Sequence, residues 1–192
     1  MAGFAWKRWL LAAAVLTLGA CGGGGDSGSG ATTPPAPTGP QVTKAEAYRF
    51  LNQATFGATE AEAQRLIDLG DTTTSFTRWI DAQIALPAST ELATVEAAYP
   101  NPLPTNFNIA QMHGARVDAW LAHALTANDQ LRQRVAFALS QIMVVSQIGA
   151  LQNLPFAVTD YQDMLARNAF GDFRQLMEDV TLHPAMGVYL SM

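Results

Sequence analysis

The chain has 192 residues, of which 49% are hydrophobic and 14% charged, and its formal net charge is −5. This composition favours a folded helical domain over a disordered chain. No run of Lys and Arg occurs anywhere, so the sequence predicts no binding to nucleic acid. The single cysteine excludes a disulfide bond within the chain.

Residues 1–20 have the three parts of a secretory signal peptide. Lys7 and Arg8 give it a positive start, an apolar stretch covers 10–18, and small residues precede a cleavage site. The apolar stretch is much shorter than the ~20 residues that a membrane-spanning helix needs. The sequence therefore predicts that the chain is exported and that the signal peptide is removed.

Leu18-Gly19-Ala20-Cys21 resembles the bacterial lipobox at all of its positions. The resemblance implies that the Cys21 thiol receives a diacylglycerol and that, in many bacteria, the new amine is acylated as well. Two or more acyl chains give stable anchoring to membrane lipid, whereas one gives only weak binding. Gly22 rather than Asp follows Cys21, which favours the outer membrane in a Gram-negative host. The alternative is an ordinary signal peptide followed by an incidental cysteine.

Residues 21–41 are predicted to comprise the lipidated Cys21 followed by a tether rich in Gly, Ser, Pro and Thr. Glycine and serine dominate the first half, and four prolines stiffen the second half. Such a stretch does not bury enough apolar surface to offset the entropy lost on ordering it. We expect a disordered spacer that holds the folded domain away from the membrane.

Residues 42–192 predict a mainly α, multi-helix domain with orthogonal or bundle-like packing. Capping boxes at Thr43/Glu46 and Thr59/Glu62 open the first two helices, and Asp129 caps a later one. Prolines make 99–104 a loop, and no stretch alternates like a strand. The predicted helices cover 43–51, 59–70, 75–86, 91–98, 109–127, 129–149, 156–169 and 173–182, and another turn starts at Pro184.

Apolar residues at helical spacing predict the faces that these helices bury. The Trp and Phe residues lie at such positions, so we interpret them as core rather than as a carbohydrate-binding platform. The expected buried stripes are Phe76, Trp79, Ile80 and Ile84 in the third helix, Val117, Trp120, Leu121, Ala124 and Leu125 in the fifth, and Leu131, Val135, Ala138, Leu139 and Ile142 in the sixth.

Three stretches of the sequence, 49–57, 130–140 and 165–187, are typical of one bacterial family. They read RFLNQATFG, QLRQRVAFALS and LARNAFG running on to LHPAMG. The chain beyond the tether thus resembles the N-terminal part of the family named domain of unknown function 1800. The resemblance implies a mainly helical, often exported protein. Its members are typically more than twice as long, so we expect this chain to be an N-terminal piece.

No metal and no cofactor are predicted. Many relatives carry a Trp-His-Asn-His pattern on the helix that begins near Gln130, whereas residues 138–141 here read Ala-Leu-Ser-Gln. His113, Asp118 and His123 are five residues apart, a spacing that does not gather them on one helix face. Ser140 and Ser191 lack a nucleophile-elbow motif. Arg132 and Arg134 are expected on a solvated or ion-paired face, with an anion site as the alternative.

His183 and Asp179 are the candidate catalytic residues. They lie four positions apart and can meet on one helix face if the helix extends that far. A carboxylate that orients an imidazole occurs in catalytic sites. It also occurs as an ordinary device at the end of a helix, and the sequence leaves both interpretations open.

Two functions from different classes agree with these features. The first is a non-catalytic interaction or scaffold module of the cell envelope, whose partner is an envelope protein or polymer. Its basis is the lipobox, the spacer and the lack of a complete catalytic set. The second is a hydrolase acting on an envelope or extracellular polymer, with Asp179 and His183 completed by a missing C-terminal half.

Overall fold

The computed structural model describes residues 39–99 and 108–191, all within the compact unit Ala36–Met192. The predicted signal peptide, Cys21 and all but the last residues of the predicted tether lie outside the described residues. Most of the predicted loop 99–104 lies outside them as well. Contacts to the domain begin before Val42, because Gln41 forms an isolated antiparallel bridge with Asp71.

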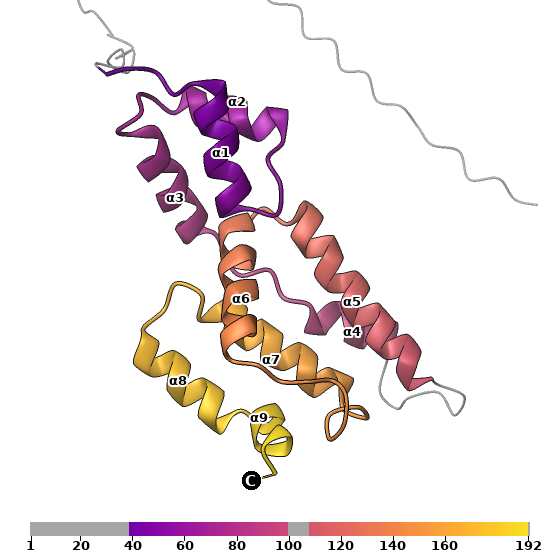
Figure 1. Cartoon of the computed structure of the whole chain (residues 1–192). Helices are drawn as coiled ribbons and strands as arrows, with labels where there is room; N and C mark the ends of the chain where they lie inside the picture. Colours follow the sequence, from indigo (N-terminus) through magenta and orange to yellow (C-terminus); the bar gives the residue numbers. More distant parts are fainter. Residues whose placement is uncertain (1–38, 100–107, 192) are drawn as a thin grey trace, which may run out of the picture. The chain divides into compact units, whose positions relative to one another are not determined.

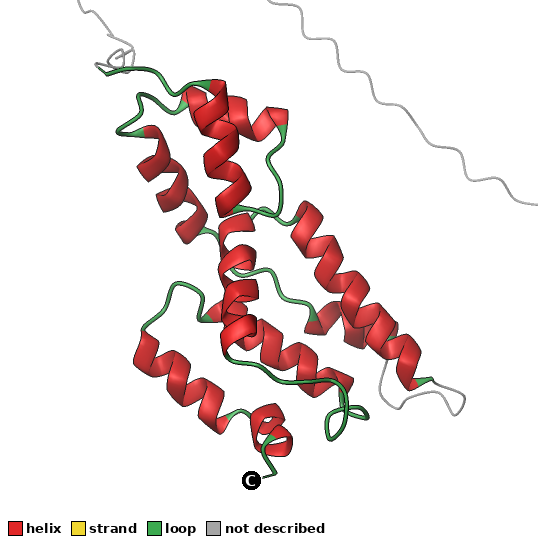
Figure 2. Ribbon diagram, in the orientation of Figure 1, coloured by secondary structure: helices red, strands yellow, loops and turns green. Residues whose placement is uncertain are grey.

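The described residues fold into α-helices and contain no strand, which confirms the mainly α prediction (Figures 1 and 2). The predicted helix 129–149 is shorter than expected, because a loop follows Ile142. Within residues 39–99 and 108–191, no helix combines the length and apolarity that crossing a membrane requires. The helices are α1 (Lys44–Ala54), α2 (Glu60–Asp68), α3 (Ser75–Ala85), α4 (Leu92–Ala98), α5 (Ile109–Thr126), α6 (Gln130–Ile142), α7 (Pro155–Arg167), α8 (Phe173–Leu182) and α9 (Pro184–Tyr189).

The first two helices begin at their predicted caps, but only the first has a complete capping box. Thr43 accepts a hydrogen bond from the Glu46 backbone N–H, and the Glu46 carboxylate accepts one from Thr43. Thr59 caps α2 in the same way, yet the Glu62 carboxylate does not return the bond. It accepts the indole N–H of buried Trp79 at 2.7 Å instead, since a buried N–H needs an acceptor.

Two apolar clusters form the core, with α6 between the helices that carry them (Figure 1). One cluster lies among α1, α2 and α3, where Leu51, Leu66 and Trp79 are buried. The other lies among α7, α8 and α9, where Tyr161 and Leu165 are buried. Helix α6 packs against α1 and α3 on one side and against α7 on the other.

The predicted buried stripes of α5 and α6 are partly wrong. On α5, Val117, Leu121 and Leu125 are 41%, 43% and 77% exposed. On α6, Ala138 and Ile142 are exposed, as is Ile84 at the end of α3. The most buried residues of α6 are instead Arg132 and Gln133. The reason is that α6 faces the ends of other helices, whose backbone groups need polar partners.

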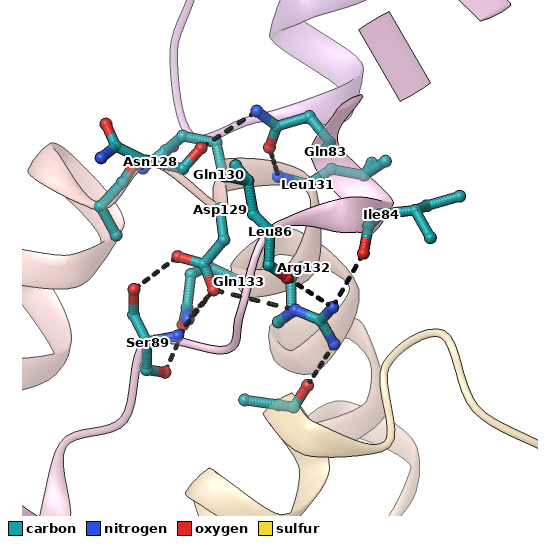
Figure 3. Close-up of polar contacts among 12 residues, drawn as sticks. Gln83, Ile84, Leu86, Ser89, Asn128, Asp129, Gln130, Leu131, Arg132 and Gln133 are labelled. Carbon is teal, nitrogen blue, oxygen red and sulfur yellow. Dashed lines mark hydrogen bonds and ion pairs between the residues drawn. The ribbon is translucent and has the colours of Figure 1, made fainter. Parts of the chain in front are cut away.

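Figure 3 shows the polar contacts at the start of α6 that bury Arg132 and Gln133 in place of the predicted apolar side chains. Asp129 is the residue before α6, but its carboxylate does not cap that helix. It accepts the backbone N–H and the hydroxyl of Ser89 at 2.9 and 2.7 Å, and the Gln133 side chain at 3.1 Å. Nearby, Gln83 donates to the Asn128 carbonyl and accepts from the Leu131 backbone.

Arg132 is buried rather than on a solvated face, which corrects the expectation from the sequence. Its guanidinium donates to the carbonyl oxygens of Ile84, Leu86 and Ala166 at 3.1–3.3 Å. Its Nε lies 3.9 Å from Asp129, so the ion-paired part of the expectation holds. One side chain therefore connects the end of α3 to the end of α7 through α6.

We predict that Asp129→Ala lowers the free energy of unfolding by about 3 kcal/mol, because it leaves the Ser89 donors without their acceptor and removes the ion-pair partner of buried Arg132. Urea denaturation followed by circular dichroism measures the change. Asp118→Ala, which removes an exposed carboxylate of α5, is the matched control and is expected to have little effect. Equal losses in the two variants would contradict the structural role of Asp129.

Candidate functional site

Three ionisable side chains lie in the interior where α4, α5 and α7 meet. Glu91 immediately precedes α4, Arg116 belongs to α5 and Asp163 belongs to α7. Their exposed fractions are 4%, 7% and 2%. Buried ionisable groups are costly unless they are paired, and they often mark functional sites.

Asp163 has a clear structural task. Its two carboxylate oxygens accept the backbone N–H groups of Glu91 and Leu92 at 2.8 and 2.9 Å. These are donors at the start of α4 that have no partner within that helix. Burial raises the pKa of Asp163, and the two backbone hydrogen bonds oppose that rise. Asp163 therefore acts as a cap that α7 supplies to α4.

Arg116 is held by neutral groups. One terminal nitrogen donates to the side-chain oxygen of Gln162 at 2.9 Å, and the other donates to that of Gln147. Its Nε is buried without a hydrogen-bond partner. Burial lowers the pKa of Arg116, an effect that the negative charge of Glu91 partly offsets. The guanidinium thus retains donor capacity, and no described carboxylate forms an ion pair with it.

Glu91 has a carboxyl group with a raised pKa. Its Oε2 atom is buried without a hydrogen-bond partner. Burial, and then the charge of Asp163, raise the pKa of Glu91 to about 7, while Arg116 works in the opposite direction. The carboxyl therefore titrates near neutral pH, where an ordinary exposed glutamate is fully ionised.

Two hollows adjoin this cluster and share Ser140 and Gln162 in their walls. The smaller, about 20 Å³, lies against Glu91 and Asp163 and has room for roughly one water molecule. The larger, about 350 Å³, lies against Arg116 and the loop after α6. Because Glu91 interacts electrostatically with Arg116, a change of charge at Glu91 alters the electrostatic potential in the cavity that Arg116 lines.

A further hollow, about 480 Å³, lies elsewhere, between the α1–α2 turn, α3 and the end of α5. Phe56, Trp79 and Leu86 give it apolar walls, and Leu125 of α5 reaches its edge. Glu62 and Arg65, which form an ion pair at 2.7 Å, supply the charged part of the lining. This surface can receive an apolar side chain beside a polar rim.

The structure does not join the two candidate catalytic residues to each other. Helix α8 ends at Leu182, so His183 lies outside the helix, and no hydrogen bond or ion pair is formed between the described side chains of Asp179 and His183. Hydrogen bonds from Asn168 and Gln175 to Asp179 lower the pKa of that carboxyl. The imidazole is still near enough for its charge to help lower the pKa of Asp179. A catalytic role for Asp179 or His183 stays a prediction.

His183 has contacts that fit the helix-end interpretation. Its Nδ1 accepts the backbone N–H of Ala185 at 3.1 Å and so caps α9. Its Nε2 lies 3.2 Å from a carboxylate oxygen of Asp160, within ion-pair distance but not aligned as a hydrogen bond. The ring packs edge-on against Tyr161. The imidazole, 9% exposed, is therefore occupied by structural contacts.

The remaining candidates are dispersed. His113 Nε2 lies 2.9 Å from the Gln152 carbonyl oxygen, and no described hydrogen bond joins it to His123. Arg134 lies over the rings of Phe56 and Phe137 rather than in an ion pair. Ser140 donates to a carbonyl of its own helix. Among residues 39–99 and 108–191, no group of three His, Cys, Asp or Glu side chains could hold a metal ion.

The sequence does contain a signal for the buried cluster that our sequence analysis missed. Met112, Arg116 and Ala119 are spaced by four and three residues, which places them on one face of α5, and all three are buried. An arginine on the buried stripe of a helix requires acceptors from a neighbouring element. Asp163 gives a similar signal, because it stands next to the buried Met164-Leu165-Ala166 run.

The family model described as "Protein of unknown function (DUF1800)" matches residues 49–192. The match confirms the resemblance seen in the sequence, and it covers every element that supplies the buried cluster and the cavities. Neither the curated proteins nor the solved structures that were searched give a match.

We predict that stability falls as pH rises from about 4.5 to about 7, because the unfolded chain releases the Glu91 proton earlier than the folded chain does. The loss amounts to about 3 kcal/mol and persists above pH 7. Glu91→Gln removes this decline, so the variant is expected to be the more stable protein at pH 8. Urea denaturation at several pH values tests this. Glu96→Gln, on the exposed side of α4, is the control, and parallel pH profiles for wild type and Glu91→Gln would contradict the assignment.

Proposed function

The chain belongs to the family of proteins of unknown function DUF1800, and on that premise we propose that it is an interaction module of the bacterial cell envelope. A lipid on Cys21 holds it at a membrane, the outer membrane in a Gram-negative host. The observation that carries the proposal is a row of exposed apolar side chains on α5 that reaches the 480 Å³ hollow.

The exposed side of α5 presents an apolar ridge. Val117, Leu121 and Leu125 follow one another at four-residue spacing, which aligns them along one side of the helix. The exposure of Leu125, 77%, is among the highest of the large apolar side chains. Scattered apolar residues on a surface are ordinary, whereas a contiguous row marks a place where another molecule binds.

The ridge continues into the 480 Å³ hollow, since Leu125 belongs to the ridge and also lines the hollow. The hollow has the apolar walls and the charged rim that protein interfaces use to anchor one side chain and orient its neighbours. An amphipathic helix of a partner fits this combination, with an apolar residue in the hollow and others along α5. We therefore infer an envelope protein as the partner, with an envelope polymer as the alternative.

The hydrolase alternative receives less support from the geometry. The contact between His183 and Asp160 is the observation in its favour. However, the imidazole caps α9 and is nearly fully buried, so a substrate has no direct access to it. A catalytic base has to lie within hydrogen-bond reach of the group from which it takes a proton.

We predict that a photo-crosslinking residue in place of Ala122, exposed on α5, labels one defined partner when the full-length chain is expressed in its envelope. The double variant Leu121→Lys, Leu125→Lys removes the apolar contact and is expected to abolish the crosslink. Phe173→Lys with Met177→Lys, which alters exposed apolar residues of α8, is the matched control. A crosslink that survives on the α5 variant, or none on the wild type, would refute the interaction surface.

Metabolic labelling with a palmitate analogue tests the anchor. We expect label on the wild type and none on Cys21→Ser, because the chain has no other thiol that can form the thioether. The membrane fraction is expected to lose the variant as well, since the acyl chains supply the anchoring free energy. Label retained by Cys21→Ser would show that lipidation at this position is wrong.

A further inference from the structure

The cavity of about 350 Å³ beside Arg116 has the size of a small-molecule site. It lies between α5, the end of α6, the loop 143–148 and α7. Arg116 is the one charged side chain in its described lining, and it is 7% exposed. The rest of its lining combines polar side chains, among them Gln147 and Gln162, with aliphatic ones.

Arg116 has the donors that a carboxylate needs. Its terminal nitrogens are held by the amide oxygens of Gln147 and Gln162, which fix the guanidinium in place without neutralising it. No described carboxylate forms an ion pair with Arg116. A positioned guanidinium with free donors binds carboxylates with matched geometry, better than an ammonium group does.

The side-chain amides of Gln147 and Gln162 favour a ligand that also has a hydrogen-bond acceptor. Gln147 and Gln162 accept through their oxygens, so their NH₂ groups are the donors that remain for a ligand. An amide carbonyl next to the carboxylate would satisfy such a donor. The lining also contains Val144, Val158 and Ile148, which can contact a short aliphatic side chain.

These features together identify a ligand class. We propose that the cavity beside Arg116 binds a carboxylate with a short aliphatic side chain and an adjacent amide, as at the C-terminal end of a peptide. The site is separate from the proposed interaction surface, because Val117, Leu121 and Leu125 do not line this cavity. Either proposal can therefore fail without the other.

The charged groups near the cavity predict that an anionic ligand binds more tightly at lower pH. The groups that face Glu91 are Asp163 of α7 and Arg116 of α5, with neutral Gln133 and Ser140 of α6. When Glu91 takes up a proton, the positive charge of Arg116 is no longer offset. A carboxylate in the cavity then meets a stronger field.

The test uses the full-length chain and titrates N-acetyl-L-valine, with N-acetyl-L-valinamide as the neutral probe, in isothermal titration calorimetry. We expect saturable binding of the acid and at least about tenfold weaker binding of the amide. The neutral amide supplies no carboxylate to the Arg116 guanidinium. Equal affinity for the two probes, or no saturable binding of the acid at millimolar concentration, would overturn the proposal.

Two variants locate the site. Arg116→Gln is expected to weaken binding of the acid by about tenfold or more, while Arg174→Gln, which alters an exposed arginine of α8, leaves it unchanged. Val144→Trp fills the cavity from a residue that is 49% exposed and leaves the Arg116 hydrogen bonds intact, so it removes binding even if Arg116→Gln misfolds. A Val144→Trp protein that binds like the wild type would overturn the proposal.

The pH dependence separates a ligand contact from a merely structural role for Arg116. Wild-type affinity for N-acetyl-L-valine is expected to rise several-fold between pH 8 and pH 6, and Glu91→Gln is expected to bind at pH 8 as the wild type does at pH 6. Weaker binding by Glu91→Gln at pH 8 would place the ligand on Glu91 instead of Arg116 and refute the assignment.

Discussion

The connection between the two apolar cores depends on the polar contacts at the start of α6. Neither core extends through this region, and the helix that joins them buries Arg132 and Gln133 where apolar side chains would normally lie. The backbone carbonyls at the ends of α3 and α7 are the reason, because they need donors that apolar side chains do not supply. A guanidinium with several donors can serve three carbonyls from different elements at once.

This arrangement explains which features could be predicted from the sequence. The caps at Thr43 and Thr59 and the start of α9 at Pro184 depend on neighbouring residues, and the structure has them as expected. The faces of α5 and α6 depend on contacts across the chain. Periodicity places Leu121 and Leu125 on a core face by default, whereas the structure gives that place to Arg116 and its partners on α7.

The buried cluster of Glu91, Arg116 and Asp163 was not predicted from the sequence for a related reason. Glu91, Arg116 and Asp163 are separated by many residues in sequence, and no motif with fixed spacing links them. Each belongs to a helix or helix end for which a local interpretation is sufficient. By contrast, Asp179 and His183 have a suggestive spacing, yet α8 ends between them and gives them different partners. Spacing along a helix has meaning only as far as the helix extends.

The buried cluster combines satisfied and unsatisfied groups, and that combination has a physical consequence. Asp163 is fully occupied by the start of α4, so it fixes Glu91 in place while also raising the pKa of Glu91. Arg116 is fixed by neutral amides, which hold its geometry but leave its charge. A site built only for stability would neutralise that charge with an adjacent carboxylate or replace it by an apolar side chain of similar volume. No described carboxylate forms an ion pair with Arg116, and the charge of Glu91 offsets its burial only in part. A ligand that supplies an anion would offset the remaining free-energy cost of burying Arg116.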